Sequence, residues 1–95
     1  MLLAKVKGTI VSTAKADTTE GTKYLLVQLC DQREKPANAY VVALDLVGAG
    51  VGEVVIIAQG SSARQTKQTF EKPIDAVIVG IVDLIEEKGE VAYRK

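Results

Sequence analysis

The chain of 95 residues contains no histidine and no tryptophan, and only one phenylalanine and one cysteine. Without histidine, a serine–histidine–aspartate triad, a cysteine–histidine dyad and a histidine metal site are excluded. The single cysteine, Cys30, excludes an intrachain disulfide and a thiolate zinc cage within one chain. We therefore expect a protein that is not an enzyme and that uses no metal and no cofactor.

Net charge and long apolar runs are missing as well. Twelve basic residues balance twelve acidic ones, whereas a non-specific nucleic-acid binder needs surplus lysine and arginine. The few aromatic residues also make a poor platform for base stacking. No apolar run approaches the roughly 20 residues that span a bilayer, and the first five residues lack the basic flank of a signal peptide. We therefore expect a cytoplasmic protein with no nucleic-acid partner and no membrane segment.

The residues that are abundant favour β structure in one small domain, residues 1–95. Valine and isoleucine together number 20 against 8 leucines, and β-branched residues favour strands. Alternation of apolar and polar residues over 2–13 predicts a half-buried strand, with Gly8 at a bend or bulge. Further strands are predicted over residues 23–31, 39–46, 53–58 and 75–84, and residues 90–94 form either a short edge strand or a tail.

Residues 61–68 read as a short helix with a serine cap. Five strands and one short helix predict a mostly β fold, a small closed five-stranded barrel with an OB-like plan. The apolar content of 47% is high for a domain of this size. Because a small domain buries comparatively little of its own surface, we expect the chain to form an oligomer.

The densest glycine cluster is formed by Gly48, Gly50 and Gly52. A dinucleotide-binding loop needs the pattern G-x-G-x-x-G between a strand and a helix, but here Glu53 occupies the place of the third glycine and a strand follows. The cluster therefore predicts a tight backbone excursion, which is able to approach another subunit closely.

Three aspartates, Asp45, Asp75 and Asp83, lie beside apolar strand segments. A pair of carboxylates can act as acid and base or bind a metal, but the sequence places no two of them together. Each is more typical of a turn cap, a strand end or an ion-pair partner. Cys30 lies in an apolar strand and is expected to be a small buried hydrophobe.

Residues 60–64 combine the amides of a helix start with two hydroxyls and a cation, Arg64. Such a group is able to hold an anion, although a serine helix cap beside a solvated arginine is the simpler interpretation. The segment leaves one alternative function open. In that alternative, the chain is an OB-like binding module for a small anion or for single-stranded nucleic acid.

Four segments, taken in order, resemble the EutN/CcmL family, the pentameric vertex proteins of bacterial microcompartment shells. They are residues 4–13 (AKVKGTIVST), 43–55 (ALDLVGAGVGEVV), 60–64 (GSSAR) and 73–76 with 80–83 (PIDA and GIVD). The resemblance implies a five-stranded barrel that assembles into a cyclic pentamer with a narrow axial opening. It also implies hexameric shell proteins as partners, because flat hexagonal sheets close only where five-fold points are introduced. The enclosed pathway, whether ethanolamine or propanediol utilization, glycyl-radical chemistry or carbon fixation in a carboxysome, stays open.

The resemblance also implies roles for particular residues. Three glycines would let the backbone pack against a neighbouring subunit or turn near the axis: Gly48, Gly50 and Gly52. The carboxylates of Asp45 and Glu53 would accept hydrogen bonds between subunits. A third group would lie near the pore or the subunit boundary: Ser61, Ser62 and Arg64.

Overall fold

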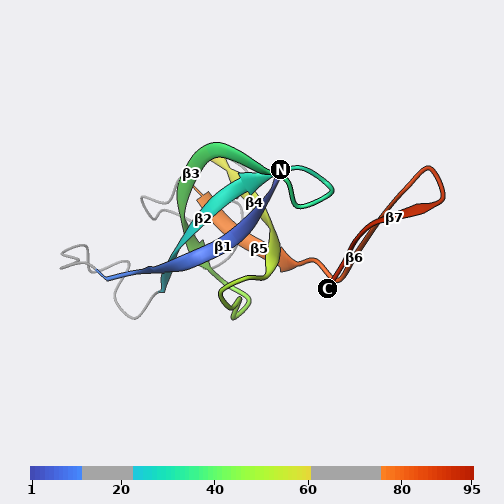
Figure 1. Cartoon of the computed structure of the whole chain (residues 1–95). Helices are drawn as coiled ribbons and strands as arrows, with labels where there is room; N and C mark the ends of the chain where they lie inside the picture. The colour runs from blue at the N-terminus through green and yellow to red at the C-terminus, as the bar shows by residue number, and fades with distance from the viewer. Residues whose placement is uncertain (12–22, 61–75) are drawn as a thin grey trace.

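The computed structural model describes residues 1–11, 23–60 and 76–95, which form seven strands (Figure 1). The strands are β1 (Leu2–Ile10), β2 (Tyr24–Cys30), β3 (Pro36–Asp45), β4 (Val54–Gln59), β5 (Ala76–Ile81), β6 (Leu84–Glu87) and β7 (Glu90–Arg94). The first five close into a barrel in the order β1-β2-β3-β5-β4, and β6 and β7 form a separate two-stranded sheet. All pairings are antiparallel except a short parallel contact between β3 and β5.

This strand order confirms the predicted five-stranded, OB-like barrel. The helix predicted over residues 61–68 lies outside the described residues. Across the three described ranges, no helix has the length and apolar character needed to cross a membrane.

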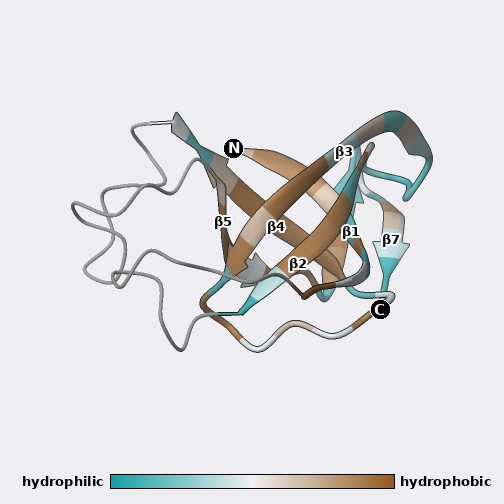
Figure 2. Ribbon diagram, turned by 90° about the vertical axis from the view of Figure 1, so that its left-hand side faces the viewer, coloured by the Kyte–Doolittle hydropathy of each residue, from teal (hydrophilic) through white to brown (hydrophobic). Residues whose placement is uncertain are grey.

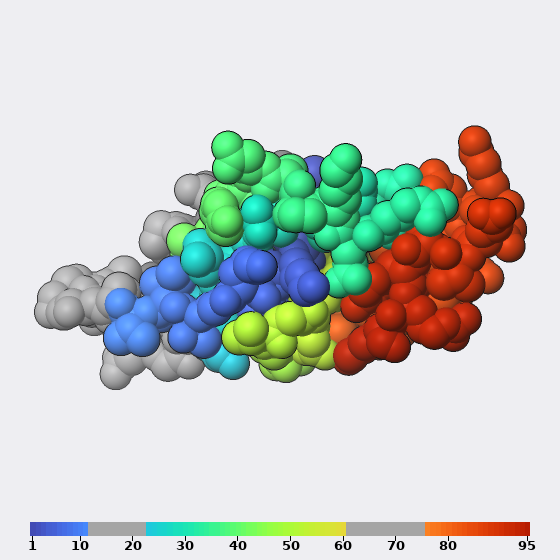
Figure 3. Space-filling view, in the orientation of Figure 1, coloured from blue at the N-terminus to red at the C-terminus, as the bar shows by residue number. Residues whose placement is uncertain are grey.

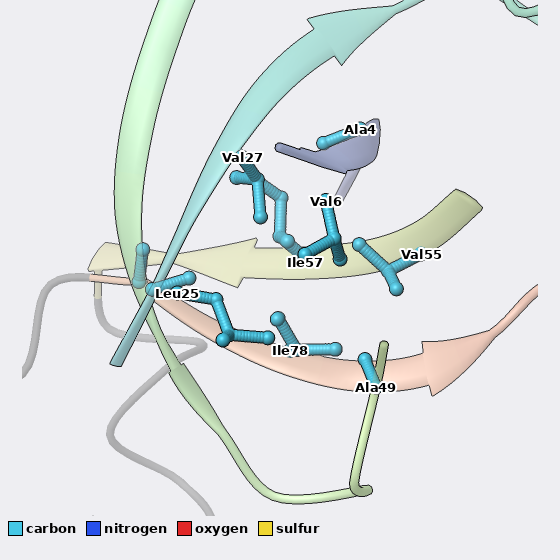
Figure 4. Close-up of a cluster of buried hydrophobic side chains, with 10 residues drawn as sticks. Ala4, Val6, Leu25, Val27, Ala49, Val55, Ile57 and Ile78 are labelled. Carbon is cyan, nitrogen blue, oxygen red and sulfur yellow. The ribbon is translucent and has the colours of Figure 1, made fainter. Parts of the chain in front are cut away.

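The barrel core is filled by alternate residues of the strands. Val6 on β1 lies opposite Val27 on β2, and Val55 and Ile57 on β4 face the same interior. Figure 4 shows these side chains converging between the strands, with Ile78 of β5 among them. Each is at most 1% exposed, and burying an aliphatic side chain of this size stabilises the fold by about 1.5–3 kcal/mol.

β4 is buried on both of its faces. Val55 and Ile57 point into the barrel, while Val54 packs outside it against Val82 and Tyr93. In Figure 2, β4 is hydrophobic over most of its length. Cys30 packs beside the same outer cluster and is half-buried rather than buried, because it lies near the end of β2.

β1 contains the irregularity that Gly8 predicted. The register between β1 and β2 shifts between Val6 and Gly8, which leaves Lys7 as the extra residue of a bulge. Val6 pairs with Val27 in the core, whereas Gly8 pairs with Leu26. Because paired residues share a face of the sheet, and because Leu26 alternates with the buried Leu25 and Val27, Gly8 lies on the outer face of the barrel.

Two strand predictions need correction. The strand predicted over residues 75–84 ends at Ile81 in the structure, and β6 follows after a break at Val82 and Asp83. The strand predicted over residues 39–46 begins earlier, at Pro36, and ends at Asp45. A proline is accommodated as the first residue of a strand, where no ladder donor is needed.

Residues 90–94 are a strand and not a tail. β7 pairs with β6 through a two-residue turn in which Lys88 and Gly89 both have positive φ, 55° and 80°. This combination is that of a type I′ turn, which suits the twist of a tight hairpin. The hairpin projects from one end of the barrel (Figure 1), and Tyr93 anchors it against Val54.

Candidate functional site

The glycine-rich loop of residues 46–53 connects β3 to β4 and is held at its start by Asp45. The Asp45 carboxylate accepts hydrogen bonds from the backbone N–H groups of Val47 (3.1 Å), Gly48 (3.0 Å) and Ala49 (3.1 Å to Oδ2). Its side chain is only 2% exposed, and the ammonium of Lys23 lies 3.9 Å away. Asp45 therefore acts as the turn cap that the sequence indicated, because a short carboxylate side chain readily bonds nearby backbone amides.

Two of the three glycines adopt backbone conformations that other residues rarely take. Gly48 has φ of 75° and Gly52 has φ of 92°, and only glycine reaches this region without steric cost. Gly50 has an ordinary φ, and a Cβ added there would lie 3.5 Å from Glu53 Oε1. The loop leads directly into β4, so the strand that was predicted after the glycines is confirmed.

Glu53 closes the loop at its other end. Its carboxylate accepts a 2.6 Å hydrogen bond from the N–H of Gly50 and pairs with the ammonium of Lys95. The Lys95 ammonium and the Gly50 N–H together hold the pKa of Glu53 below its ordinary value. Reciprocally, Glu53 raises the pKa of Lys95. The end of β7 is thus tied to the start of β4.

The loop faces two environments at once. Ala49 is 2% exposed and packs into the barrel core, where Figure 4 shows it beside Ile78. Val47 and Val51 are 39% and 67% exposed. A loop fixed by Asp45 and Glu53 therefore presents two apolar side chains to its surroundings, in the way that interfaces between subunits do.

The described residues do not assemble a chemical centre. Both loop carboxylates already bond within their own chain, Asp83 is 82% exposed beside Lys95, and no three metal-ligating side chains gather in the described ranges. Burial raises the pKa of the Cys30 thiol, which lowers the fraction present as the nucleophilic thiolate. These features fit a surface for packing better than a site for catalysis.

Of the predicted site residues, Asp45, Gly48, Gly50, Gly52 and Glu53 come together in this one loop. Ser61, Ser62, Arg64 and Asp75 lie outside the described residues. Sequence reasoning missed Lys95 as the partner of Glu53, since no local pattern links residues so far apart. It also passed over Val51, although an apolar residue between glycines in a polar turn is a usable sign of an exposed contact.

Comparisons with known proteins agree with this geometry. A family model described as "Ethanolamine utilisation protein EutN/carboxysome" matches residues 1–83. The carboxysome shell vertex protein CcmL of Synechocystis sp. is 45% identical over all of this chain and 95% of its own length. The microcompartment shell vertex protein EutN of Escherichia coli is 39% identical over the whole of both chains. A solved structure of GrpN, a pentameric microcompartment shell protein of Rhodospirillum rubrum, is 47% identical, with a TM-score of 0.83 over 92% of this chain and 99% of that one.

Proposed function

This chain belongs to the EutN/CcmL family, and on that basis we propose that it is a pentameric vertex protein in the shell of a bacterial microcompartment. The observation that carries the proposal is the match along the whole chain to shell vertex proteins. The role is structural and not enzymatic, and the shell lies in the cytoplasm. The relatives are shell proteins, so the alternative of an OB-like module for anions or nucleic acid loses its support.

The glycine-rich loop supplies a rigid edge for such an assembly. A cyclic ring forms when one surface of a subunit meets a different surface of its neighbour and the rotation closes. Gly48, Gly50 and Gly52 leave the backbone uncovered by side chains, and the bonds of Asp45 and Glu53 keep that backbone in one conformation. In the proposed pentamer, the loop from Asp45 to Glu53 lines a boundary between subunits, with Val51 as an apolar contact.

Hexameric shell proteins are the proposed partners of the pentamer. A sheet of hexagons is flat, and it closes into a polyhedron only if five-fold units occupy the corners. A pentamer of this chain would supply those units. The zero net charge of the chain suits such a role, because subunits and shell partners are brought together without strong charge repulsion.

The first test of this proposal is the mass of the native particle. Native mass spectrometry of the wild-type chain, at 10.1 kDa per subunit, is expected to give about 50 kDa for a closed ring of five. A monomer that binds oligonucleotides in a salt-sensitive manner would refute the vertex role and revive the alternative. A hexamer would refute five-fold closure.

The second test is shell closure. Co-expression with hexameric shell proteins is expected to give closed polyhedra by electron microscopy, and open sheets or tubes when this chain is left out. Within that assay, an Arg64→Ala variant tests the prediction that Ser61, Ser62 and Arg64 lie near the pore or the subunit boundary. Unchanged ring assembly and unchanged closure would refute that placement.

A further inference from the structure

Within the described chain, the backbone of the β6–β7 hairpin joins the barrel only at the base of the hairpin. β6 and β7 form a sheet of their own, which shares no ladder with the barrel strands. The N–H of Val82 donates to the carbonyl of Val54 at 2.8 Å, and the N–H of Lys95 donates to the carbonyl of Asp83 at 2.9 Å. The buried side chain of Tyr93 packs at the same end. An element with few buried contacts beyond its base is one that opens locally, unless something else holds it.

The far end of the hairpin is held through one side chain, that of Glu87. Of residues 86–91, only Glu87 is half-buried, and the rest are exposed. Gln32 Nε2 donates a hydrogen bond of 2.9 Å to Glu87 Oε1, and the guanidinium of Arg33 lies 4.0 Å from the same oxygen. Among the described residues, no other side-chain hydrogen bond or ion pair joins residues 86–91 to the barrel. Figure 3 shows the residues between β2 and β3, in turquoise, against the hairpin, in red.

Gln32 and Arg33 belong to a tightly bonded turn, residues 31–35, which we call the β2–β3 turn. Asp31 Oδ1 accepts hydrogen bonds from the N–H groups of Arg33 (2.8 Å) and Lys35 (2.9 Å). The N–H groups of Lys35 and Arg33 hold the pKa of Asp31 below its ordinary value, because they stabilise its ionised form. The turn is therefore fixed within itself.

Glu34 fixes the β2–β3 turn to the barrel as well. Its carboxylate accepts a 2.9 Å hydrogen bond from the ammonium of Lys5, which lies on β1. Its φ is 67°, in the left-handed region that costs energy for a residue with a side chain. A turn that keeps this conformation and is bonded to a neighbouring strand is a rigid support for whatever else it contacts.

The contact at Glu87 is weak enough to break without unfolding the barrel. The side chains of Arg33 and Glu87 are 55% and 40% exposed, and ion pairs at such exposure are individually weak. At the base, by contrast, Tyr93 is 8% exposed and Val54 is fully buried. Loss of the contact at Glu87 is therefore expected to free the far end of the hairpin while the barrel stays folded.

From these observations we propose that the β2–β3 turn sets the angle of the hairpin on the barrel, and that it acts through Glu87. While Gln32 and Arg33 hold Glu87, the hairpin is fixed. When that contact is broken, the hairpin moves about its base at Val82 and Lys95. This conformational device belongs to the single subunit, so the inference goes beyond the proposed function and does not depend on it.

Cys30, the only cysteine of the chain, reports on this movement. It directly precedes the β2–β3 turn and packs against the cluster of Val54, Val82 and Tyr93 at the base of the hairpin. Movement of the hairpin away from the turn uncovers this side of the cluster, so the thiol is expected to react in proportion to the open fraction. Glu87 is not among the groups that shift the pKa of this thiol. Replacing Glu87 therefore acts on the covering of the thiol rather than through its own charge.

A Glu87→Ala variant removes the acceptor that the turn holds. The rate at which iodoacetamide alkylates Cys30 in native buffer, followed by mass spectrometry, is expected to rise roughly three- to tenfold, as the loss of one partly exposed hydrogen bond allows. The midpoint of urea unfolding is expected to change little, because the barrel core is untouched. Glu86→Ala is the matched control, since it removes the same charge from an exposed neighbouring residue, and it is expected to leave the rate unchanged.

An unchanged rate in Glu87→Ala, or an equal rise in Glu86→Ala, would overturn the proposal. A rise in the Cys30 rate that is accompanied by a matching fall in the urea midpoint would also overturn it, because a general loss of stability would then account for the exposure of the thiol.

Variants of the turn test the same contact from the other side. Gln32→Ala removes the donor of the 2.9 Å bond and is expected to raise the Cys30 rate, and its combination with Glu87→Ala is expected to match Glu87→Ala alone, because both changes break one contact. Gln28→Ala is the control, since the side-chain amide of Gln28 donates to the carbonyl of Ala37 within the β2–β3 pair, and no change is expected. Effects of Gln32→Ala and Glu87→Ala that multiply in the double variant would show two independent contacts and contradict the proposal.

Discussion

Replacing Asp45 by alanine removes the group that fixes the glycine-rich loop. The carboxylate is 2% exposed and accepts backbone hydrogen bonds from three successive residues. After the change, the half-buried N–H of Ala49 loses its acceptor, and Ala49 itself is part of the barrel core. The loop is then expected to lose its fixed conformation, which lowers both the free energy of unfolding and the stability of the ring.

The size of the effect follows from where each N–H lies. Leaving a half-buried N–H without an acceptor costs about 1–3 kcal/mol, and losing a bond at the surface, where water substitutes, costs about 0.5–1 kcal/mol. With one bond of the first kind and two of the second, Asp45→Ala is expected to lower the free energy of unfolding by about 2–5 kcal/mol. In a domain of this length, that corresponds to a Tm lowered by roughly 10–20 °C.

Urea unfolding followed by circular dichroism, at two protein concentrations, separates this effect from dissociation of the ring. Asp45→Asn keeps one acceptor oxygen and is expected to lose about half as much stability. Asp83→Ala is the matched control, since its carboxylate is 82% exposed and 3.9 Å from Lys95, and little change is expected. If Asp45→Ala is as stable as Asp83→Ala, then the loop is not held by Asp45 and the reasoning is wrong.

Two further predictions concern the same loop. Because the pKa of Glu53 is lowered in the folded state, its stabilising contribution is present above the ordinary pKa of 4.5 and is lost as the pH falls through the lowered pKa. The difference in Tm between wild type and Glu53→Gln is therefore expected to narrow below pH 4.5. A difference in Tm that stays constant down to pH 3 would contradict the pairing with Lys95. Gly52→Ala places a side chain on a residue whose φ is 92° and is expected to lower the free energy of unfolding by about 1–2 kcal/mol. Gly50→Ala, whose Cβ lies at an ordinary contact distance, is expected to leave the urea midpoint nearly unchanged. Equal urea midpoints for the two variants would argue against backbone strain at Gly52.

The first barrel strand was predictable because its alternation is local. Ala4 and Val6 are buried while Lys7 is exposed, and this period of two is visible in the sequence itself. The turn cap at Asp45 was predictable for a similar reason, since the aspartate precedes a run of glycines and bonds amides within four residues.

The hairpin was predictable only in part: residues 90–94 were expected as a strand or a tail, and their pairing with β6 depends on contacts between distant segments. The apolar run of residues 76–84 reads as one strand, and only Asp83 marks the point where the chain leaves the barrel. What turns the following residues into β6 and β7 is Tyr93 packing on Val54. The pairing of Lys95 with Glu53 follows from that packing, so no residue close to either one in the sequence predicts it.

The closed barrel has a consequence for how shells of this kind are able to change. Its five strands pair among themselves, so in the proposed pentamer we expect the barrels to meet through side chains and loops rather than by adding strands to one another. The angle between neighbours is then set by surface residues that the barrel core does not need. Substitutions on that surface are therefore able to change the curvature of a ring without unfolding the barrel. This makes the vertex protein a suitable target for engineering compartments of different size.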